Sequence, residues 1–365
     1  MTEQNTQLMQ EVNDARNEIK TDTYQMSIGE IISLYQAGDI NLAPAYQRLF
    51  RWKDEQKTNF IESLIIGIPV PPIFVAQKED GKWDIVDGVQ RVSTILQLTG
   101  DLNGQKLFDL TSCKYLPSIE GLTWETLPAE IQRLIKRSKL TLNIILTKNS
   151  IKAQYEVFQR LNTGGLHLSE QEIRNCLIIM SNENFYNEIN RFKDDAGFKG
   201  ITLLSTEQNE QEFRMELILR YLIAKYRKTN FEEYKLHSML VSEFIDSETL
   251  ALINDPHFNL TSELEILQRT SDLLFTKLGP TAFAKYWIDK QSFDNKFNLQ
   301  VFEALLPGLA SNIDRLGSKS TTELKEIIKG LCCQPSYVLA TGRGIKALKR
   351  FKDLTDLSFQ YFGTV

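Results

Sequence analysis

A change in hydrophobic pattern along the 365-residue chain is the feature that most constrains the fold. Before about residue 150, short stretches such as 140–147 alternate apolar and polar residues, as half-buried strands do, and amphipathic helical stretches lie between them. Farther on, long stretches such as 210–228 and 261–279 have helical spacing, and strand-like alternation nearly disappears. The pattern therefore predicts an α+β fold, in which a mixed domain with a small sheet precedes an all-helical domain.

Three regions follow from this pattern. Residues 1–22 are polar and are predicted to form a helical arm, residues 23–180 the mixed domain, and residues 181–365 the helical domain. Within the mixed domain, Ser27 and Glu30 have capping-box spacing before a short helix, and residues 54–67 have helical spacing that ends at a glycine. Two short apolar runs within residues 68–88 flank a polar Asp-Gly turn, which predicts a β-hairpin.

Composition excludes several classes of protein. With 42% hydrophobic and 24% charged residues, the chain resembles ordinary globular proteins. No apolar run is long enough for a membrane span and no signal core is visible, so we expect a cytoplasmic protein without membrane contact. The four cysteines and three histidines lack zinc-site spacing, and the net charge of −5 gives no global attraction to DNA. Any nucleic-acid binding would need a local basic patch.

The stretch "WDIVDGVQRVSTILQLTG" carries the first candidate site, at a junction where a short strand gives way to a helix. Such a junction presents backbone N–H groups and the positive end of a helix dipole to an anion. Its candidate residues are Asp87, Gly88, Gln90, Arg91, Ser93 and Thr94. In the alternative interpretation, Asp87 caps the helix, Gly88 makes a turn and Arg91 is solvated.

Two further motifs are candidates for ligand contact. In "PAYQRLFRW", aromatic residues alternate with arginines, which suits stacking on a base and binding a phosphate, but the rings could equally belong to the core. In "FQRLNTGGLHLSEQEIRN", a polar loop with two glycines could fold around a ligand or simply connect two helices. The candidate residues of these motifs are Tyr46, Gln47, Arg48, Arg160, Asn162, Thr163, Gly164 and Gly165.

Four ordered blocks, taken together, resemble the domain of unknown function 262 family, the N-terminal half of GmrSD-type modification-dependent restriction enzymes. The blocks are P-x-Y-Q-R-x-x-x-W at residues 44–52, I-P-x-P-P at 68–72, D-G-x-Q-R at 87–91 and F-x-R-x-N-T-G-G-x-x-L-S at 158–169. The resemblance implies a ParB/sulfiredoxin-like fold for the mixed domain. It also implies binding, and in several members hydrolysis, of nucleoside triphosphates at the D-G-x-Q-R turn.

The resemblance makes Asp87, Gly88, Gln90 and Arg91 the centre of the predicted site, with Arg48 and Asn162 in the same cleft. The hypothesis is phosphoryl transfer to water, in which Arg91 and the helix start neutralise phosphate, Mg²⁺ bridges phosphate oxygens, and Asp87 or Gln90 positions the attacking water. Asp87 is also the predicted metal ligand. One departure is Val89, where the common family form has glutamine, so a polar contact available to relatives is missing.

Restriction-type relatives often carry an HNH nuclease domain, whose histidine and asparagine pattern is absent around His237 and His257. We therefore expect no self-contained HNH nuclease, and a role in DNA surveillance or phage defence with a separate nuclease or effector protein as partner. The resemblance alone supplies this context. A homodimer and binding of modified or phage DNA are kept as open alternatives.

Two other functions compete with nucleotide hydrolysis. The protein could be a non-catalytic, nucleotide-gated or DNA-binding module, with Lys346, Lys349 and Arg350 on one positive helix face. The commoner interpretation of these cations is that they stabilise a helix end and keep the protein soluble. A ParB-like DNA nickase ranks last, because phosphodiester cleavage by two metal ions needs several converging carboxylates.

Overall fold

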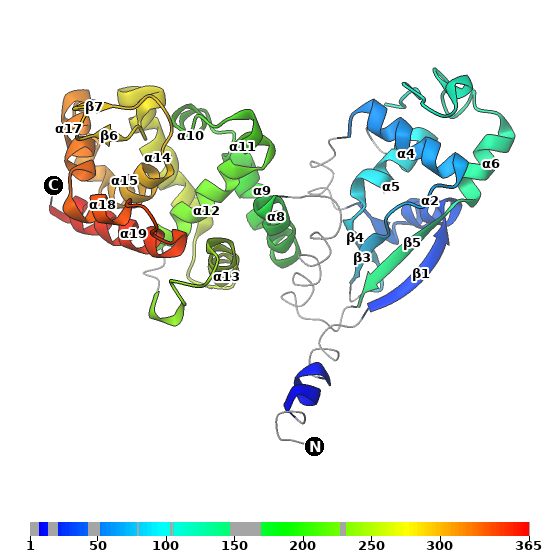
Figure 1. The fold of residues 1–365 in the computed structure, drawn as a ribbon, viewed down its shortest axis with the longest axis horizontal. Coiled ribbons are helices and arrows are strands. Elements are labelled where there is room, and N and C mark those ends of the chain that lie inside the picture. The colour runs from blue at the N-terminus through cyan, green and yellow to red at the C-terminus, as the bar shows by residue number, and fades with distance from the viewer. Residues whose placement is uncertain are drawn as a thin grey trace. The chain divides into compact units, whose positions relative to one another are not determined.

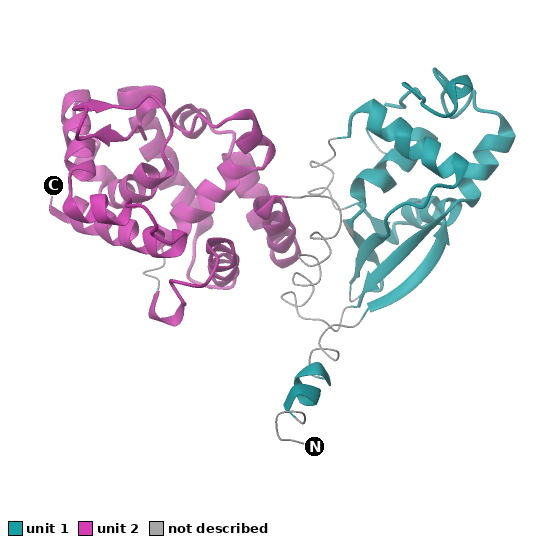
Figure 2. Cartoon of the chain, in the orientation of Figure 1, with its two compact units in different colours: residues 1–167 teal, residues 168–365 magenta. Residues whose placement is uncertain are grey.

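A computed structural model shows two compact units, residues 1–167 and residues 168–365, which we describe separately (Figures 1 and 2). The structure describes residues 7–13, 21–42, 52–78, 80–102, 104, 106–146, 169–226 and 231–364. Among these residues, no helix combines the length and the apolar character that a bilayer crossing requires.

The first unit is mixed, as predicted. Its strands are β1 (Thr21–Ser27), β2 (Ile40–Asn41), β3 (Ile73–Gln77), β4 (Trp83–Asp87) and β5 (Lys139–Ile145). Its helices include α2 (Ile28–Ala37), α4 (Asp54–Ile66), α5 (Val89–Thr99) and α6 (Ala129–Arg137). The strand order in the sheet is β1-β5-β3-β4-β2, with β3 antiparallel to β4 and parallel to β5. The predicted hairpin is confirmed as β3 and β4.

Strand β1, at one edge of the sheet, was not predicted. It begins at Thr21, inside the region assigned to the polar arm, and pairs antiparallel with β5. Among its seven residues only Met26 is buried, so β1 has no alternating apolar pattern to reveal it. Residues 7–13 are helical, which agrees with a helical arm over the part that the structure describes. Ser27, the last residue of β1, caps α2 by accepting a hydrogen bond from the Glu30 N–H.

Over its described residues the second unit is mainly helical, and they show one exception to the predicted all-helical pattern. Its helices are α8 (Glu170–Ser181), α9 (Glu183–Phe192), α10 (Ala196–Ile201), α11 (Thr206–Glu210), α12 (Phe213–Tyr226), α13 (Val241–Ile253), α14 (Leu260–Leu278), α15 (Leu299–Ser311), α16 (Ile313–Leu316), α17 (Thr321–Cys332), α18 (Pro335–Ala340) and α19 (Ala347–Thr364). The exception is a small hairpin of β6 (Tyr286–Trp287) and β7 (Ser292–Phe293). Strands of two residues are too short to show alternation in the sequence.

Two details of the second unit differ from the sequence pattern. The division between units precedes α8, whereas we predicted a boundary after residue 180, because α8 packs against α9 and α13 of the helical unit. The single helix predicted over 210–228 is interrupted: α11 ends at Glu210 and α12 begins at Phe213. Glu212 between them has a φ of 57°, in the left-handed region where a helix cannot continue.

Buried charges connect four helices in the core of the second unit. Arg174 of α8 is fully buried and pairs with Asp246 of α13 at 2.5 Å and with Glu216 of α12 at 3.4 Å. Arg220 of α12 pairs with Glu216 and with Glu303 of α15, each at 2.7 Å. Because a buried charge without a partner is strongly destabilising, this network fixes which faces of these helices meet.

Candidate nucleotide site at the strand-to-helix junction

The candidate site is the turn from β4 into α5, where the chain reverses at a glycine. Asp87 ends β4, and Gly88 is the N-cap of α5 with φ 94° and ψ 11°, a left-handed conformation. A Cβ atom at Gly88 would lie 2.8 Å from Cγ1 of Ile73, so the neighbouring strand also excludes a side chain here. Since Gly88 offers no side chain, the start of α5 has no side-chain cap.

Arg91 lies on the first turn of α5 and is only 3% exposed. Its Nη2 donates to Oδ2 of Asp87 at 3.0 Å, and its Nη1 donates to the carbonyl oxygens of Pro71 and Pro72, the latter at 3.0 Å. Burial lowers the pKa of Arg91 from its usual value, while the negative charge of Asp87 acts in the opposite direction. The guanidinium therefore holds the "IPVPP" segment and the "DGVQR" turn together.

These contacts bear on the two interpretations of the junction. The alternative with Asp87 as the cap and Arg91 in solvent does not describe it, because Gly88 is the N-cap and Arg91 is buried. Arg91 was predicted to offer its planar fork to a phosphate, and in the structure its nitrogens already donate to three oxygens of the protein. Asp87 keeps 28% of its side chain exposed and uses Oδ2 for Arg91.

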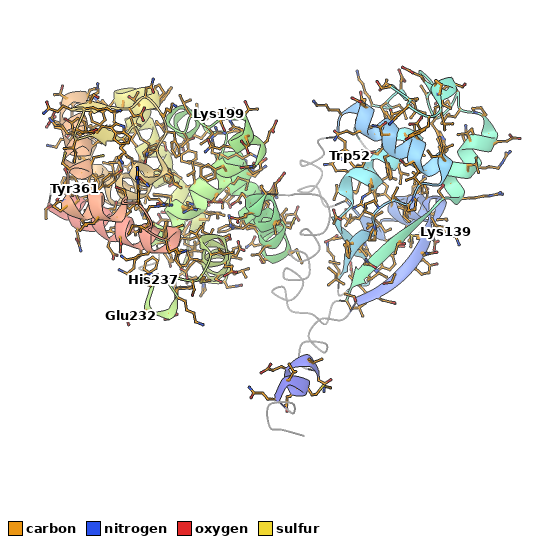
Figure 3. The ribbon with its side chains drawn as sticks, viewed as in Figure 1. Trp52, Lys139, Lys199, Glu232, His237 and Tyr361 are labelled. Carbon is orange, nitrogen blue, oxygen red and sulfur yellow. The ribbon has the colours of Figure 1, made fainter. Side chains whose placement is uncertain are left out.

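Gln90 connects the turn to the end of the first sequence block. Its Oε1 accepts a hydrogen bond from the backbone N–H of Trp52 at 3.2 Å. Trp52 lies just before α4 (Figure 3). Its ring makes an edge contact with the Phe60 ring, with centroids 5.6 Å apart. The residues 52 and 90, far apart in sequence, are thus brought together at the candidate site.

Ser93 and Thr94 face the packed interior of the unit. They are 1% and 0% exposed, and Thr94 donates its hydroxyl to the backbone oxygen of Gln90 at 2.7 Å. Val89, at the position of the common glutamine, is also buried. Of the predicted residues at this junction, Asp87 alone therefore combines a charged side chain with exposure to solvent.

The other predicted nucleotide contacts lie outside the described residues, and their roles stay predictions: Tyr46, Gln47, Arg48, Arg160, Asn162, Thr163, Gly164 and Gly165. In "LSEQEIRN", the capping box at Ser169 and Glu172 is confirmed at the start of α8.

The three cations predicted to bind DNA lie at or just before the start of α19, and two of them act on acidic side chains. Lys346 precedes α19, and its carbonyl oxygen accepts the hydrogen bond from the Arg350 N–H. Lys349 pairs with Asp353 at 2.5 Å. Arg350 is only partly exposed, its Nε is buried without a hydrogen-bond partner in the described chain, and its charge acts on the buried Glu303.

Metal binding by protein side chains alone is not supported in the part of the chain that the structure describes. No group of three or more His, Cys, Asp or Glu side chains converges there. Mg²⁺ is, however, commonly held by one or two carboxylates together with phosphate oxygens of a nucleotide. The partly exposed carboxylate of Asp87 beside the start of α5 fits that mode of binding.

Comparison with known proteins supports the resemblance. A family model described as "GmrSD restriction endonuclease, N-terminal domain" matches residues 28–179. All four sequence blocks lie within this range, so the predicted resemblance to this family is confirmed for this part of the chain. No curated protein and no solved structure matches. The ParB/sulfiredoxin-like assignment therefore stays a prediction.

Sequence reasoning missed the role of the proline segment. The sequence motif marked residues 68–72 as a block but gave them no function, and in the structure the carbonyl oxygens of Pro71 and Pro72 bind Arg91. Proline lacks an N–H, so its backbone offers only a carbonyl oxygen as a hydrogen-bond acceptor. A pair of such acceptors is what an arginine side chain can bind. Which arginine that would be is not visible from spacing alone.

Proposed function

We propose that residues 28–179 bind and hydrolyse a nucleoside triphosphate at the "DGVQR" turn, within a restriction-like defence system. The family that matches this range is named for restriction endonucleases, which supports the setting. The observation that carries the site is the start of α5, which has no side-chain cap and lies next to the partly exposed carboxylate of Asp87. A helix start of this kind favours phosphate through its N–H groups and its dipole.

In this proposal Asp87 acts on the reaction and Arg91 acts on Asp87. Oδ2 of Asp87 is held by Arg91 at 3.0 Å, which fixes the orientation of the carboxylate. The other oxygen of Asp87 would hold Mg²⁺ or accept a proton from the attacking water. Mg²⁺, when bound with the nucleotide, would neutralise charge on the phosphate oxygens. Arg91 is thus a positioning residue.

The remaining contacts come from the other sequence blocks. Gln90 is proposed to align the chain at Trp52, which follows Arg48 by four positions, so that the first block lies beside the turn. Arg48 and Arg160 are proposed to contact phosphates, and residues 162–165 to fold around the nucleotide. Their residue types suit these roles, since arginine binds phosphate with a planar fork and glycine permits close approach.

The wider role is proposed from the family alone. We propose that nucleotide turnover reports on modified or phage DNA and controls a separate nuclease or effector protein. Because Lys349 pairs with Asp353 and the charge of Arg350 acts on Glu303, our proposal does not place DNA contact at α19.

Phosphate release from ATP, GTP, CTP and UTP with Mg²⁺ tests the proposal, with wild type beside Asp87→Asn. We expect wild type to release phosphate from at least one nucleotide and Asp87→Asn to lose at least about 100-fold of that rate, as loss of a positioned acid-base group does. Equal rates in the two proteins would remove Asp87 from the reaction. An Asp87-independent thermal shift without turnover would instead favour a nucleotide-sensing module.

A further inference from the structure

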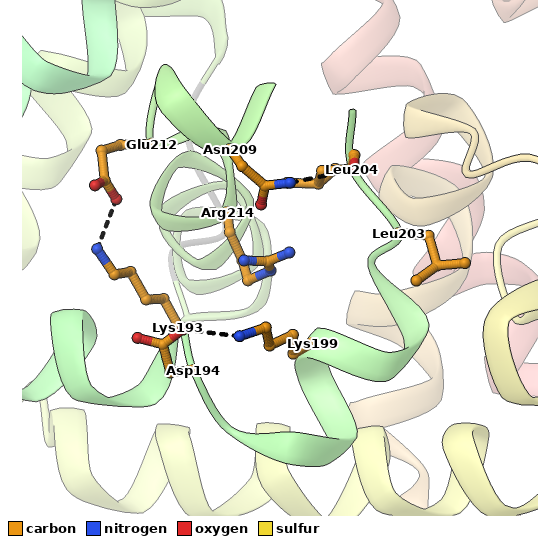
Figure 4. A pocket seen from close by; sticks show the side chains of 8 residues that line it. All are labelled: Lys193, Asp194, Lys199, Leu203, Leu204, Asn209, Glu212 and Arg214. Atoms are coloured by element: carbon orange, nitrogen blue, oxygen red, sulfur yellow. Dashed lines mark hydrogen bonds and ion pairs between the residues drawn. The ribbon is translucent and has the colours of Figure 1, made fainter. Parts of the chain in front are cut away.

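A pocket of about 570 Å³ in the second unit is separate from the residues of the proposed nucleotide site. It lies among the ends of α9, α10, α11 and α12, and its lining residues are Lys193, Asp194, Lys199, Leu203, Leu204, Asn209, Glu212 and Arg214 (Figure 4). Its size is within the range of pockets that hold small molecules. None of these residues was singled out from the sequence as part of a site.

Arg214 is the central charge of the pocket. Figure 4 shows its guanidinium beside the Lys193–Glu212 pair and above the Lys199–Asp194 pair. Nε of Arg214 donates to the hydroxyl of the fully buried Thr202 at 3.1 Å, and Nη2 donates to the Thr202 carbonyl oxygen at 3.3 Å. Nη1 has no hydrogen-bond partner among the described residues. Thr202 thus fixes one edge of the guanidinium and leaves N–H groups for a ligand.

The two carboxylates of the pocket do not neutralise Arg214 by direct contact. Glu212 is held by Lys193 at 2.7 Å, and both side chains are largely buried. Asp194 pairs with Lys199 at 3.5 Å, and both are more than half exposed, so this pair is weak and can open at little cost. Burial lowers the pKa of Arg214, although Asp194 and Glu212 act against this change. The guanidinium is therefore a partly dehydrated cation.

The pocket has the charge and shape for an anion with an apolar part. Three cations face two carboxylates, and if Asp194 turns to solvent, Lys199 and Arg214 together can balance a dianion. A phosphate monoester carries nearly two negative charges at neutral pH, whereas a carboxylate carries one. Leu203, 55% exposed at the pocket wall, offers an apolar surface to the rest of such a molecule.

We propose that this pocket binds a small phosphate monoester, with the phosphate against Arg214 and Lys199 and the organic part against Leu203. The backbone supports this geometry at Glu212, whose positive φ of 57° ends α11 and directs the chain into α12 just before Arg214. The site is independent of the proposed nucleotide hydrolysis, because it uses residues of the second unit alone.

Isothermal titration of the full chain with phenyl phosphate, inorganic phosphate and benzoate tests this inference. We expect phenyl phosphate to bind more tightly than inorganic phosphate and benzoate, because only phenyl phosphate combines a dianion with an apolar ring. Lys199→Gln should weaken phenyl phosphate binding about tenfold, the loss expected for one charge-assisted contact. Lys296→Gln, at an exposed lysine of the same unit away from the pocket, should leave binding unchanged.

Two further variants of the chain complete the test. Arg214→Lys keeps the charge but loses the fork that Thr202 orients, so it should fold and bind phenyl phosphate more weakly. Asp87→Asn should bind phenyl phosphate as wild type does, which separates this pocket from the proposed nucleotide site. The proposal would be overturned if benzoate bound as tightly as phenyl phosphate, or if Lys199→Gln left phenyl phosphate binding unchanged. It would also be overturned if duplex DNA bound in a Lys199-dependent way while phenyl phosphate did not bind.

Discussion

Replacement of Arg91 by alanine is expected to destabilise the first unit, because its contacts hold two sequence blocks together. Arg91 is 3% exposed and donates to Asp87 and to the carbonyl oxygens of Pro71 and Pro72. A hydrogen bond to a charged group contributes about 1.5–3 kcal/mol, and an unsatisfied buried acceptor costs about 1–3 kcal/mol. Because Asp87 and the proline segment are partly exposed, water replaces some of these contacts. We expect a net loss of about 2–4 kcal/mol in the free energy of unfolding.

Urea unfolding followed by tryptophan fluorescence measures this loss. Three of the four tryptophans, Trp52, Trp83 and Trp124, belong to the first unit, so fluorescence reports mainly on its unfolding. Arg133→Ala, at an exposed arginine on α6 of the same unit, is the control and should change stability by less than about 0.5 kcal/mol. If Arg91→Ala were as stable as Arg133→Ala, the buried contacts of Arg91 would contribute nothing and its positioning role would be refuted.

Two other predictions concern backbone geometry and buried charge. Gly88→Ala should cost about 1–3 kcal/mol in urea unfolding, because φ is 94° and the new Cβ would meet Ile73; an unchanged midpoint would contradict this. Burial raises the pKa of Glu216, but the charges of Arg220 and Arg174 outweigh it and the pKa lies below its usual value. Its stabilising contribution is therefore complete above the unfolded pKa of about 4.3 and is lost as pH falls through the lower folded value. Glu216→Gln should be less stable at neutral pH and should lose less stability on acidification, measured by circular dichroism; a parallel pH profile would contradict this.

The sequence predicted those elements whose pattern is local. The β3–β4 hairpin, the helix after the "DGVQR" turn and the capping box at Ser169 each depend on residues close together in the chain, and all are present. Strand β1 was missed because its only buried residue is Met26, and its stability comes from pairing with β5 more than 100 residues away.

The same distinction holds for the candidate site. The sequence predicted that Gly88 would make the turn and that α5 would begin there, since both depend on local backbone preferences. It did not predict the burial of Arg91. That burial requires Pro71 and Pro72, in the connection from α4 to β3, to lie next to α5. The pocket around Arg214 was missed for a similar reason, because its charges come from the end of α9, from α10 and from the start of α12, which meet only in the folded unit.

The central claim is that Asp87 at the start of α5 takes part in nucleotide hydrolysis, and the most direct test compares two carboxylates of the same strand. Asp84 of β4 pairs with Lys78 at 2.8 Å and is less exposed than Asp87, so Asp84→Asn is a matched control for removing one charge from β4. Phosphate release with Mg²⁺ should be retained in Asp84→Asn and lost in Asp87→Asn, with both variants folded. Equal turnover by the two variants, or loss in both, would contradict the assignment of the reaction to this turn.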